Sequence, residues 1–224
     1  MADYNAIVVG STGSVGRELI KLLASSTRCK KVVAIARRPI DPSTYATAFP
    51  GLPETHAAKV LVHVVDFDQL KIEDFAAHEA DACFCCLGTT RADAGSADAF
   101  IKVDLHYVTK AAELSKEAGI PYFGLLTASN SNKSSWFLYP RTKGLAQEAV
   151  AKLGFIRTGF FQPGLLRRGN LARTVERVAS YVLPSVSATA VAKAMLANYE
   201  SSPSTGLTVV SMADILAIDK AAIN

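Results

Sequence analysis

The chain has 224 residues, of which 50% are apolar and 20% are charged, with 14 glycines and 9 prolines. This composition is typical of an ordinary globular protein and excludes disordered, collagen-like and coiled-coil classes. The length fits one large α/β domain or two small domains. The 24 basic and 20 acidic side chains give a net charge of +4, a mild excess that favours a phosphate-bearing ligand but is too small to indicate nucleic acid.

The amino terminus carries no sign of secretion or membrane insertion. Met1–Asn5 contains no basic segment followed by an apolar run, and no apolar run approaches the roughly 18 residues that span a bilayer. Four cysteines are too few for a disulfide scaffold. Cys83 and Cys86 form a CxxC, but an extended strand would hold their Cα atoms roughly 10 Å apart, too far for a disulfide. We therefore expect a cytoplasmic protein with no membrane partner, no metal site and cysteines that fill the core.

Short β-forming runs alternate with longer amphipathic stretches along most of the chain. The strands are predicted as continuous apolar runs, which suit a parallel sheet covered on both faces. They are Asn5–Gly10, Lys31–Ala36, Val60–Val65, Ala82–Leu87, Pro121–Leu126 and Phe155–Phe161. Helices are predicted at Val15–Ser25, Gln69–His78, Ala97–Ala118 and Pro140–Leu153, the last two ended by Gly119 and Gly154. The alternation predicts a doubly wound α/β sheet of the Rossmann type with right-handed crossovers.

The pattern changes after Phe161. A basic amphipathic helix is predicted at Leu171–Leu183, a second helix at Ala188–Tyr199 and a short strand at Leu207–Val210. No Gly/Ser-rich linker separates this part, so we expect one domain over 1–224, with the core sheet in 1–161 and a small helical appendage on the substrate side in 162–224. Its arginines lack the interleaved aromatic residues of a nucleic-acid groove and are expected to form a solvated helix face. They are Arg167, Arg168, Arg173 and Arg177.

A glycine-rich loop joins the first strand to the first helix. It runs Gly10, Ser11, Thr12, Gly13, Ser14, Val15, Gly16, which gives the spacing GxxGxxG. The glycines permit a tight turn, a close approach of backbone to a pyrophosphate and close packing of helix on sheet, and the helix N-terminus offers N–H donors and a positive dipole. Between a strand and a helix, this loop predicts dinucleotide binding rather than a structural turn alone.

The end of the second strand indicates which dinucleotide binds. NAD-binding chains usually place an acidic residue there for the ribose 2′-hydroxyl, whereas this chain has Arg37 and Arg38. Because a guanidinium favours a 2′-phosphate, we expect NADP(H) rather than NAD(H), the alternative being a solvated basic turn. Asp66, after the third strand, is expected either to accept from the adenine amino group or to cap a helix.

Tyr139 and Lys143 form a YxxxK, which puts both side chains on one face of a helix. An ammonium beside a phenol favours the phenolate, so Tyr139 can exchange a proton with a carbonyl or hydroxyl oxygen. That chemistry suits hydride transfer. Pro140 disfavours the α conformation at Tyr139, so the helix is expected to begin or kink there.

Together these motifs resemble the short-chain dehydrogenase/reductase superfamily, in its atypical group, and most closely the Tat-interacting-protein-like oxidoreductases. The resemblance rests on Gly10–Gly16, Arg37–Pro39, Cys86–Arg91, Ala94-Gly95, Val103-Asp104, Lys133–Ser135, Phe137–Tyr139, Lys143-Gly144 and Gln162–Leu166. By this resemblance Tyr139 and Lys143 would form the catalytic dyad. The cofactor would be bordered by Cys86, Leu87, Gly88 and Thr89, and by a loop holding Pro163 and Gly164.

The chain departs from the family at the serine that usually lies about a dozen residues before the tyrosine. Thr127 is expected to replace it; the alternatives are Ser129 or no hydroxyl at all, the last being typical of a non-catalytic cofactor binder. The resemblance implies an NADPH-dependent reductase of a small carbonyl compound. It equally permits an NADP(H)-binding regulatory or scaffold protein with a protein partner, because members are also described as regulators. By analogy with the superfamily, a homodimer would form through the helices after strands four and five.

Overall fold

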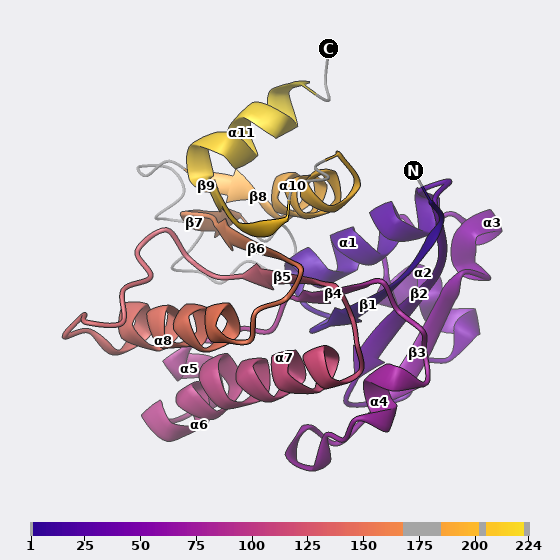
Figure 1. The fold of residues 1–224 in the computed structure, drawn as a ribbon. Coiled ribbons are helices and arrows are strands. Elements are labelled where there is room, and N and C mark those ends of the chain that lie inside the picture. Colours follow the sequence, from indigo (N-terminus) through magenta and orange to yellow (C-terminus); the bar gives the residue numbers. More distant parts are fainter. Residues whose placement is uncertain (1, 168–184, 202–204, 222–224) are drawn as a thin grey trace.

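The computed structural model describes residues 2–167, 185–201 and 205–221 (Figure 1). Seven parallel strands form its main sheet, in the order β3-β2-β1-β4-β5-β6-β9. Their bounds are β1 Tyr4–Val9, β2 Cys29–Ala36, β3 Val60–Val64, β4 Ala82–Cys85, β5 Tyr122–Leu126, β6 Arg157–Gln162 and β9 Gly206–Ser211. The strand order reverses between β1 and β4, and ligands of open α/β sheets bind at the carboxyl ends of strands at such a switch point.

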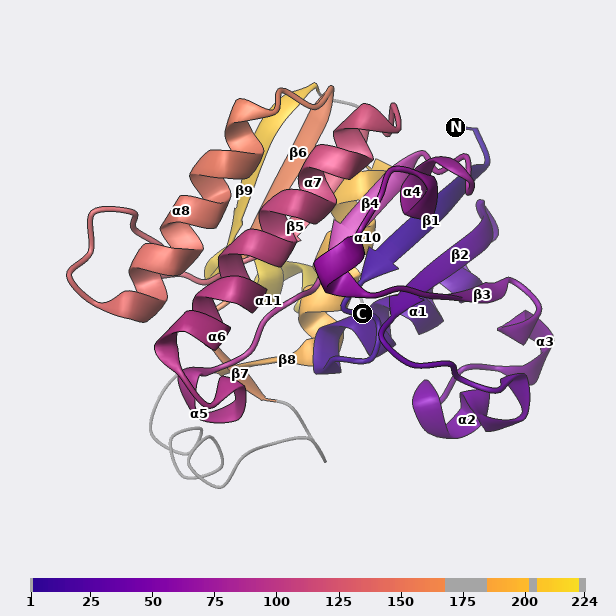
Figure 2. The same cartoon turned by 90° about the horizontal axis from the view of Figure 1, so that it is seen from below.

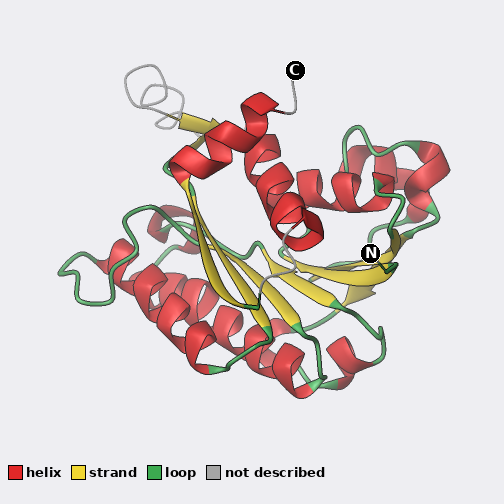
Figure 3. Ribbon diagram, turned by 45° about the horizontal axis from the view of Figure 1, so that its top comes forward, coloured by secondary structure: helices red, strands yellow, loops and turns green. Residues whose placement is uncertain are grey.

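Helices cover both faces of this sheet (Figures 1 and 3). One face packs against α1 (Ser14–Ser25) and α10 (Ala188–Ser201), and the other against α4 (Glu73–Ala76), α7 (Val108–Glu117) and α8 (Leu138–Lys152). Side chains of β1 alternate between the two cores, Ala6 and Val8 on the first side and Ile7 and Val9 on the second. The central strands are therefore apolar throughout, which confirms the predicted Rossmann-type α/β fold.

The remaining elements are mostly short. They are the 3₁₀ turns Pro42–Thr44 and Phe67–Gln69, α2 Tyr45–Ala48, α3 Glu54–Ala57, α5 Arg91–Ala94, α6 Ala97–Ile101, the π-helical turn Lys102–Tyr107, β7 Leu165–Arg167, β8 Ser185–Ser187 and α11 Met212–Ala221. Strands β7 and β8 pair in parallel as a separate two-stranded sheet.

Several predicted helices differ in detail. The stretch predicted at Gln69–His78 forms a single turn of α-helix, α4, after a 3₁₀ turn. The long helix predicted at Ala97–Ala118 is built from α6, the π-helical turn and α7, and Gly119 follows it with a positive φ of 79°. Helix α8 begins at Leu138, so Tyr139 is helical despite the following proline. Pro140 is tolerated because N–H groups of the first turn have no acceptor within the helix.

The C-terminal segment contributes more to the core than an appendage would. β9 pairs with β6 along six residues, from Arg157 opposite Gly206 to Gln162 opposite Ser211, and so extends the main sheet. Helix α10 packs directly against α1. The core sheet therefore does not end at residue 161 as expected, because the short run predicted at Leu207–Val210 pairs with β6. The helix predicted at Leu171–Leu183, with Arg168, Arg173 and Arg177, lies outside the described residues.

The third strand also differs from its predicted environment. β3 is an edge strand, and its Leu61 and Val64 side chains are 45% and 47% exposed, so it is not covered on both faces. The cysteines, in contrast, are as predicted: Cys29, Cys83, Cys85 and Cys86 are buried and free. Among the helices of the described ranges, none combines the length and apolarity needed to cross a membrane.

Candidate functional site: a dinucleotide cradle beside a tyrosine–lysine pair

The glycine loop brings three segments together at the switch point. Gly10 has a φ of 77°, and a Cβ there would lie 2.7 Å from the carbonyl carbon of Cys86 at the end of β4. A Cβ on Gly16 would overlap the carbonyl oxygen of Gly10. Gly13 precedes α1 and has no side chain to cap its first N–H groups, and the first turn holds no acidic residue. This end of α1 therefore suits an anion such as a pyrophosphate.

The Ser11 side chain points into the protein. Its side chain is fully buried, and its hydroxyl donates a 2.9 Å hydrogen bond to the carbonyl oxygen of Ile35 in β2. The hydroxyl therefore ties the glycine loop to the neighbouring strand, because its one proton is used inside the protein.

A cavity of about 490 Å³ lies over the carboxyl ends of β1, β2 and β4. Eight of the seventeen predicted cofactor residues line it, namely Gly10, Thr12, Gly13, Arg37, Cys86, Leu87, Gly88 and Thr89. Arg38 is exposed and does not line this cavity. Asp66 caps the 3₁₀ turn, since its carboxylate accepts from the N–H of Asp68 at 2.9 Å, so the structure supports its alternative role.

The outer wall of this cavity was not predicted. Phe67 and Tyr107 line it with ring centroids 5.3 Å apart. The Tyr107 hydroxyl donates to Asp68 at 2.8 Å, and Asp68 also pairs with Lys102 at 2.7 Å. These contacts join the turn after β3 to the π-helical turn beside the cavity.

A second cavity of about 130 Å³ adjoins the first, since both are lined by Gly13 and by Cys86–Thr89. Seven further predicted site residues meet here: Ser14, Val15, Thr127, Tyr139, Lys143, Pro163 and Gly164. The tyrosine–lysine pair is thus beside the glycine loop, although β1 and α8 are far apart in the sequence. Ser129 is exposed and does not line this cavity.

Lys143 is held by a buried ion pair. Its Nζ lies 2.8 Å from Oδ1 of Asp104, and the two side chains are 7% and 0% exposed. The other carboxylate oxygen of Asp104 accepts the backbone N–H of Thr89 at 2.8 Å. Burial disfavours the ammonium, but the charge of Asp104, with a further contribution from Tyr139, outweighs it and raises the pKa of Lys143. Lys143 is therefore charged at neutral pH.

Tyr139 lies at the mouth of the second cavity. It belongs to the first turn of α8, one turn before Lys143, and is 40% exposed. Its ring stacks against Phe100 of α6, with centroids 5.9 Å apart and planes 27° apart. The stacking fixes the ring, while the exposed fraction leaves the side chain accessible to a substrate.

Thr127 lines the same cavity, but its hydroxyl is already engaged. It accepts from Nε2 of Gln147 at 2.9 Å and lies 2.7 Å from the Ser131 hydroxyl. Ser131 in turn donates to the carbonyl oxygen of Ala128 at 2.7 Å, so the Thr127 proton is the one shared with Ser131. Thr127 can therefore accept a hydrogen bond from a substrate hydroxyl, but has no proton to donate to a carbonyl oxygen.

Asp104 is the main site residue that motif reasoning did not assign. A signal was present, because Phe100 and Val108 are apolar residues four positions on either side of it, and the spacing i, i+4, i+8 places all three on one helical face. A lone carboxylate on such a face must find a partner when it is buried. Lys143 is that partner, and nothing local in the sequence connects the two.

Comparison with known proteins then identifies the family. The model of the NAD-binding domain of semialdehyde dehydrogenases matches residues 5–194. The chain belongs to this family of NAD-binding domains. HTATIP2 of Rattus norvegicus is 37% identical over 166 residues, which are 74% of this chain and 64% of the rat protein. The resemblance to Tat-interacting-protein-like oxidoreductases is thereby confirmed, although the chain spans less than two thirds of that relative's length.

Two further matches concern the fold and the location of relatives. MoeE5 in complex with UDP-glucuronic acid and NAD has a TM-score of 0.72 at 16% identity, over 93% of this chain and 76% of that chain, which shows a shared fold. Protein FMP52-1, mitochondrial, of Scheffersomyces stipitis is 37% identical over 164 residues, 72% of this NAD-binding chain and 67% of the relative. The expected cytoplasmic location is therefore wrong, since several fungal relatives are named as mitochondrial proteins. The prediction rested on an N-terminus without an apolar segment, and that observation was insufficient to predict the location.

Proposed function

We propose that this NAD(P)-binding protein of the short-chain dehydrogenase/reductase type is an NADPH-dependent reductase of a small carbonyl compound. The observation that carries the proposal is the meeting of Tyr139 and Lys143 in a cavity that shares a wall with the glycine-loop cavity.

The residues of both cavities fit a nicotinamide dinucleotide. The bare N-terminus of α1 and the space that Gly10 leaves against β4 suit the pyrophosphate, and Arg37 suits a 2′-phosphate. When bound, a reduced nicotinamide supplies the hydride. Lys143 holds its charge next to Tyr139, and the Tyr139 hydroxyl gives a proton to the carbonyl oxygen of the substrate. Leu126, Ala128 and Leu166 contribute apolar walls on the substrate side.

The cofactor preference is tested by calorimetry with NADPH and NADH. We expect at least tenfold tighter binding of NADPH, about 1.4 kcal/mol. Arg37→Asp should reverse the preference, because it replaces a cation of the cavity wall with an anion. Arg38→Asp is the matched control: it makes the same charge change one residue away, outside the cavity lining, and should retain the preference. Equal affinities in the unchanged protein would exclude this assignment.

Turnover is tested on a panel of aldehydes and ketones with NADPH. Tyr139→Phe should lower the rate about 10² to 10⁴-fold, as expected for a lost general acid, and leave the affinity for NADPH unchanged. Tyr45→Phe is a suitable control, because Tyr45 is buried in the core on the opposite face of the sheet. Full activity of Tyr139→Phe would refute the dyad.

One observation favours the alternative, an NADP(H)-binding regulatory or scaffold protein. The proton of the Thr127 hydroxyl is engaged with Ser131, so Thr127 cannot donate a hydrogen bond to a substrate carbonyl beside Tyr139. This reading predicts tight NADPH binding with no turnover of any carbonyl, and a protein partner recovered only in the presence of NADPH.

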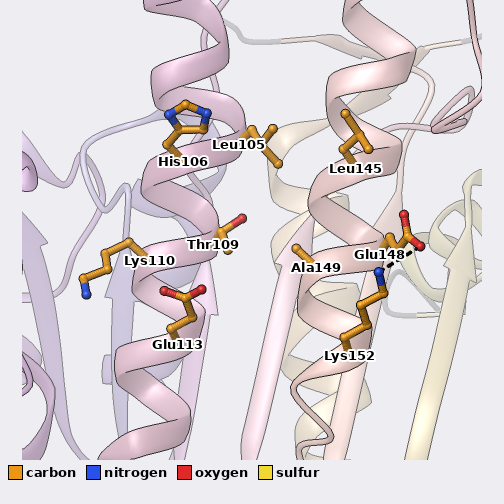
Figure 4. A pocket seen from close by; sticks show the side chains of 9 residues that line it. All are labelled: Leu105, His106, Thr109, Lys110, Glu113, Leu145, Glu148, Ala149 and Lys152. Carbon is orange, nitrogen blue, oxygen red and sulfur yellow. Dashed lines mark ion pairs between the residues drawn. The ribbon is translucent and has the colours of Figure 1, made fainter.

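We also propose a homodimer and a mitochondrial location. Helices α7 and α8 lie side by side (Figure 2), and the groove between them measures about 620 Å³ (Figure 4). Leu105, Leu145 and Ala149 line it among side chains of both charge signs, which suits a second copy of the same surface. The names of the fungal relatives support a mitochondrial location, which fractionation of cells expressing the tagged protein would test.

A further inference from the structure

Two aromatic side chains stand in solvent on the aromatic loop, residues 129–137, which joins β5 to α8. Trp136 is 95% exposed and Phe137 is 78% exposed, the highest fractions among the large apolar side chains that the structure describes. The loop projects beyond the start of α8 (Figures 1 and 2). Apolar residues scattered singly over a surface are ordinary, whereas a contiguous exposed apolar patch marks a contact surface.

The backbone of the aromatic loop is held in place, so the exposure of Trp136 does not come from an unsupported chain. The Ser135 N–H donates to the carbonyl oxygen of Asn132 at 3.0 Å, and the Phe137 N–H donates to the Ser135 hydroxyl at 3.2 Å. Gly144 of α8 lies against the same loop, because a Cβ there would be 2.5 Å from the carbonyl carbon of Asn132. The fold therefore presents both rings on a fixed support.

The charges around the two rings are mainly positive. From residue 129 to residue 147 the chain has basic residues and no acidic one. Lys133 lies 2.9 Å from Glu148, and the same carboxylate pairs with Lys152 at 3.2 Å, so one anion faces two cations. Arg141, in the first turn of α8, is exposed. The aromatic loop and the start of α8 thus suit an anionic surface.

This composition fits a lipid surface better than a protein surface. Protein interfaces are depleted in lysine and serine, and the two rings directly follow Lys133, Ser134 and Ser135 in the chain. At the surface of a bilayer, tryptophan lies at the level of the headgroups and basic side chains are attracted to anionic lipids. The expected absence of a membrane partner rested on spanning segments, which contact with a lipid surface does not require.

Both ends of the aromatic loop lie at the second cavity. Ala128 precedes the loop and Tyr139 follows it, and both line that cavity together with the apolar Leu126 and Leu166. Tyr139 is three residues after Trp136 in the sequence, so their Cα atoms are at most roughly 11 Å apart. A bilayer against Trp136 would therefore lie beside the opening through which a substrate reaches Tyr139.

We propose that the aromatic loop rests on an anionic phospholipid bilayer through Trp136 and Phe137, and that the substrate is a long-chain aldehyde or ketone taken from that lipid. The choice of substrate rests on the proposed function. The carbonyl group accepts a hydride from NADPH on its carbon and the Tyr139 proton on its oxygen, which gives an alcohol and NADP⁺. The aliphatic chain remains among the lipids while the carbonyl end enters the cavity.

The lipid contact is tested with the fluorescence of Trp136, the only tryptophan of the chain. Vesicles of phosphatidylcholine mixed with phosphatidylserine should move its emission to shorter wavelength, and brominated acyl chains should quench it. Vesicles of phosphatidylcholine alone should bind roughly tenfold more weakly, because they lack the anionic lipid. Emission that neither vesicle changes would overturn the proposal and favour a protein partner. A shift that depends on protein concentration without vesicles would overturn it in favour of a second copy of the chain.

A pair of variants assigns the contact to the aromatic loop. Phe137→Ser removes one ring and keeps the fluorescent probe, and α8 should still begin normally, because Phe137 is its N-cap and serine is favoured there. Its affinity for the mixed vesicles should fall at least about tenfold. Ile156→Ser is the matched control, since Ile156 is 60% exposed but precedes β6, at the opposite edge of the sheet. It should bind as the unchanged protein does, and equal losses in both variants would contradict the assignment.

The substrate class is tested with dodecanal in the mixed vesicles and propanal in water, each with NADPH. Turnover of dodecanal should fall at least about tenfold in Phe137→Ser, in parallel with vesicle binding, whereas turnover of propanal should not change. Turnover of propanal alone by the vesicle-bound protein would refute the lipid substrate. A protein that binds the vesicles but reduces no carbonyl compound would refute the proposed function and still support the lipid contact, so the two failures are distinguishable.

Discussion

Removing the ammonium of Lys143 should damage the fold as well as the site. In Lys143→Met, Asp104 keeps its charge at a position with no exposed side-chain surface and loses the partner that was 2.8 Å away. Breaking a buried pair in this way typically costs about 3–5 kcal/mol. That is a large part of the roughly 5–15 kcal/mol that stabilises a folded protein. For a chain of this size it corresponds to a fall in Tm of roughly 6–20 °C.

Urea unfolding followed by circular dichroism measures this loss. Fluorescence would report poorly, because Trp136 is the only tryptophan and is 95% exposed. The double variant Lys143→Met with Asp104→Asn should recover most of the stability, since neither side chain then leaves a buried charge. Lys102→Met breaks a pair of similar length, 2.7 Å, whose side chains are both 49% exposed, and should lose far less. If Lys143→Met were no less stable than Lys102→Met, the pair would not be isolated from water and the reasoning would fail.

Three further predictions concern the cradle, the core and the groove. Gly10→Ala combines a positive φ with contacts below 3 Å to the backbone of Cys86 and Leu87, so it should cost more stability and more NADPH affinity than Gly95→Ala, where φ is also positive but nothing lies within 4 Å. Equal losses in unfolding and calorimetry would contradict this. The thiol of Cys85 has a pKa raised by burial from 9.0 to about 11, so its contribution of about 3 kcal/mol is complete below pH 9.0 and is lost as the pH rises through about 11. The urea midpoint should therefore fall less between pH 9.0 and about 11 in Cys85→Ala than in the unchanged protein. If it falls equally in both, the loss of stability comes from other groups. Ala149→Arg, in the groove between α7 and α8, should convert a dimer to monomers in sedimentation experiments, and an unchanged mass would show that this face is not the interface.

The parts of the site that depend on local backbone geometry could be predicted from the sequence. GxxGxxG is a requirement on consecutive backbone positions, and the positive φ of Gly10 and the close contact of Gly16 are its direct consequences. YxxxK likewise depends only on the pitch of one helix, which places both side chains on the same face. Both features survive in the structure because no distant residue is needed to create them.

Contacts between distant segments could not be predicted in this way. The partner of Lys143 lies on another helix. The hydrogen bond to the Thr127 hydroxyl comes from Gln147, a residue of α8. The place of β9 in the sheet depends on its register with β6 and not on its own short apolar run. In each case the deciding energy comes from a pairing that only the folded chain brings about.

The packing of α10 on α1 has a consequence for the order of events during synthesis. Glu200 accepts hydrogen bonds from Tyr4 and Ser26, and Thr189 donates to Glu18, so the last long helix is fastened to the first strand and first helix. A ribosome releases the glycine loop long before it releases α10, and until then one side of α1 has no cover. Contacts of such large sequence separation also slow folding. We therefore expect a nascent chain to acquire cofactor affinity late, only after α10 has left the exit tunnel.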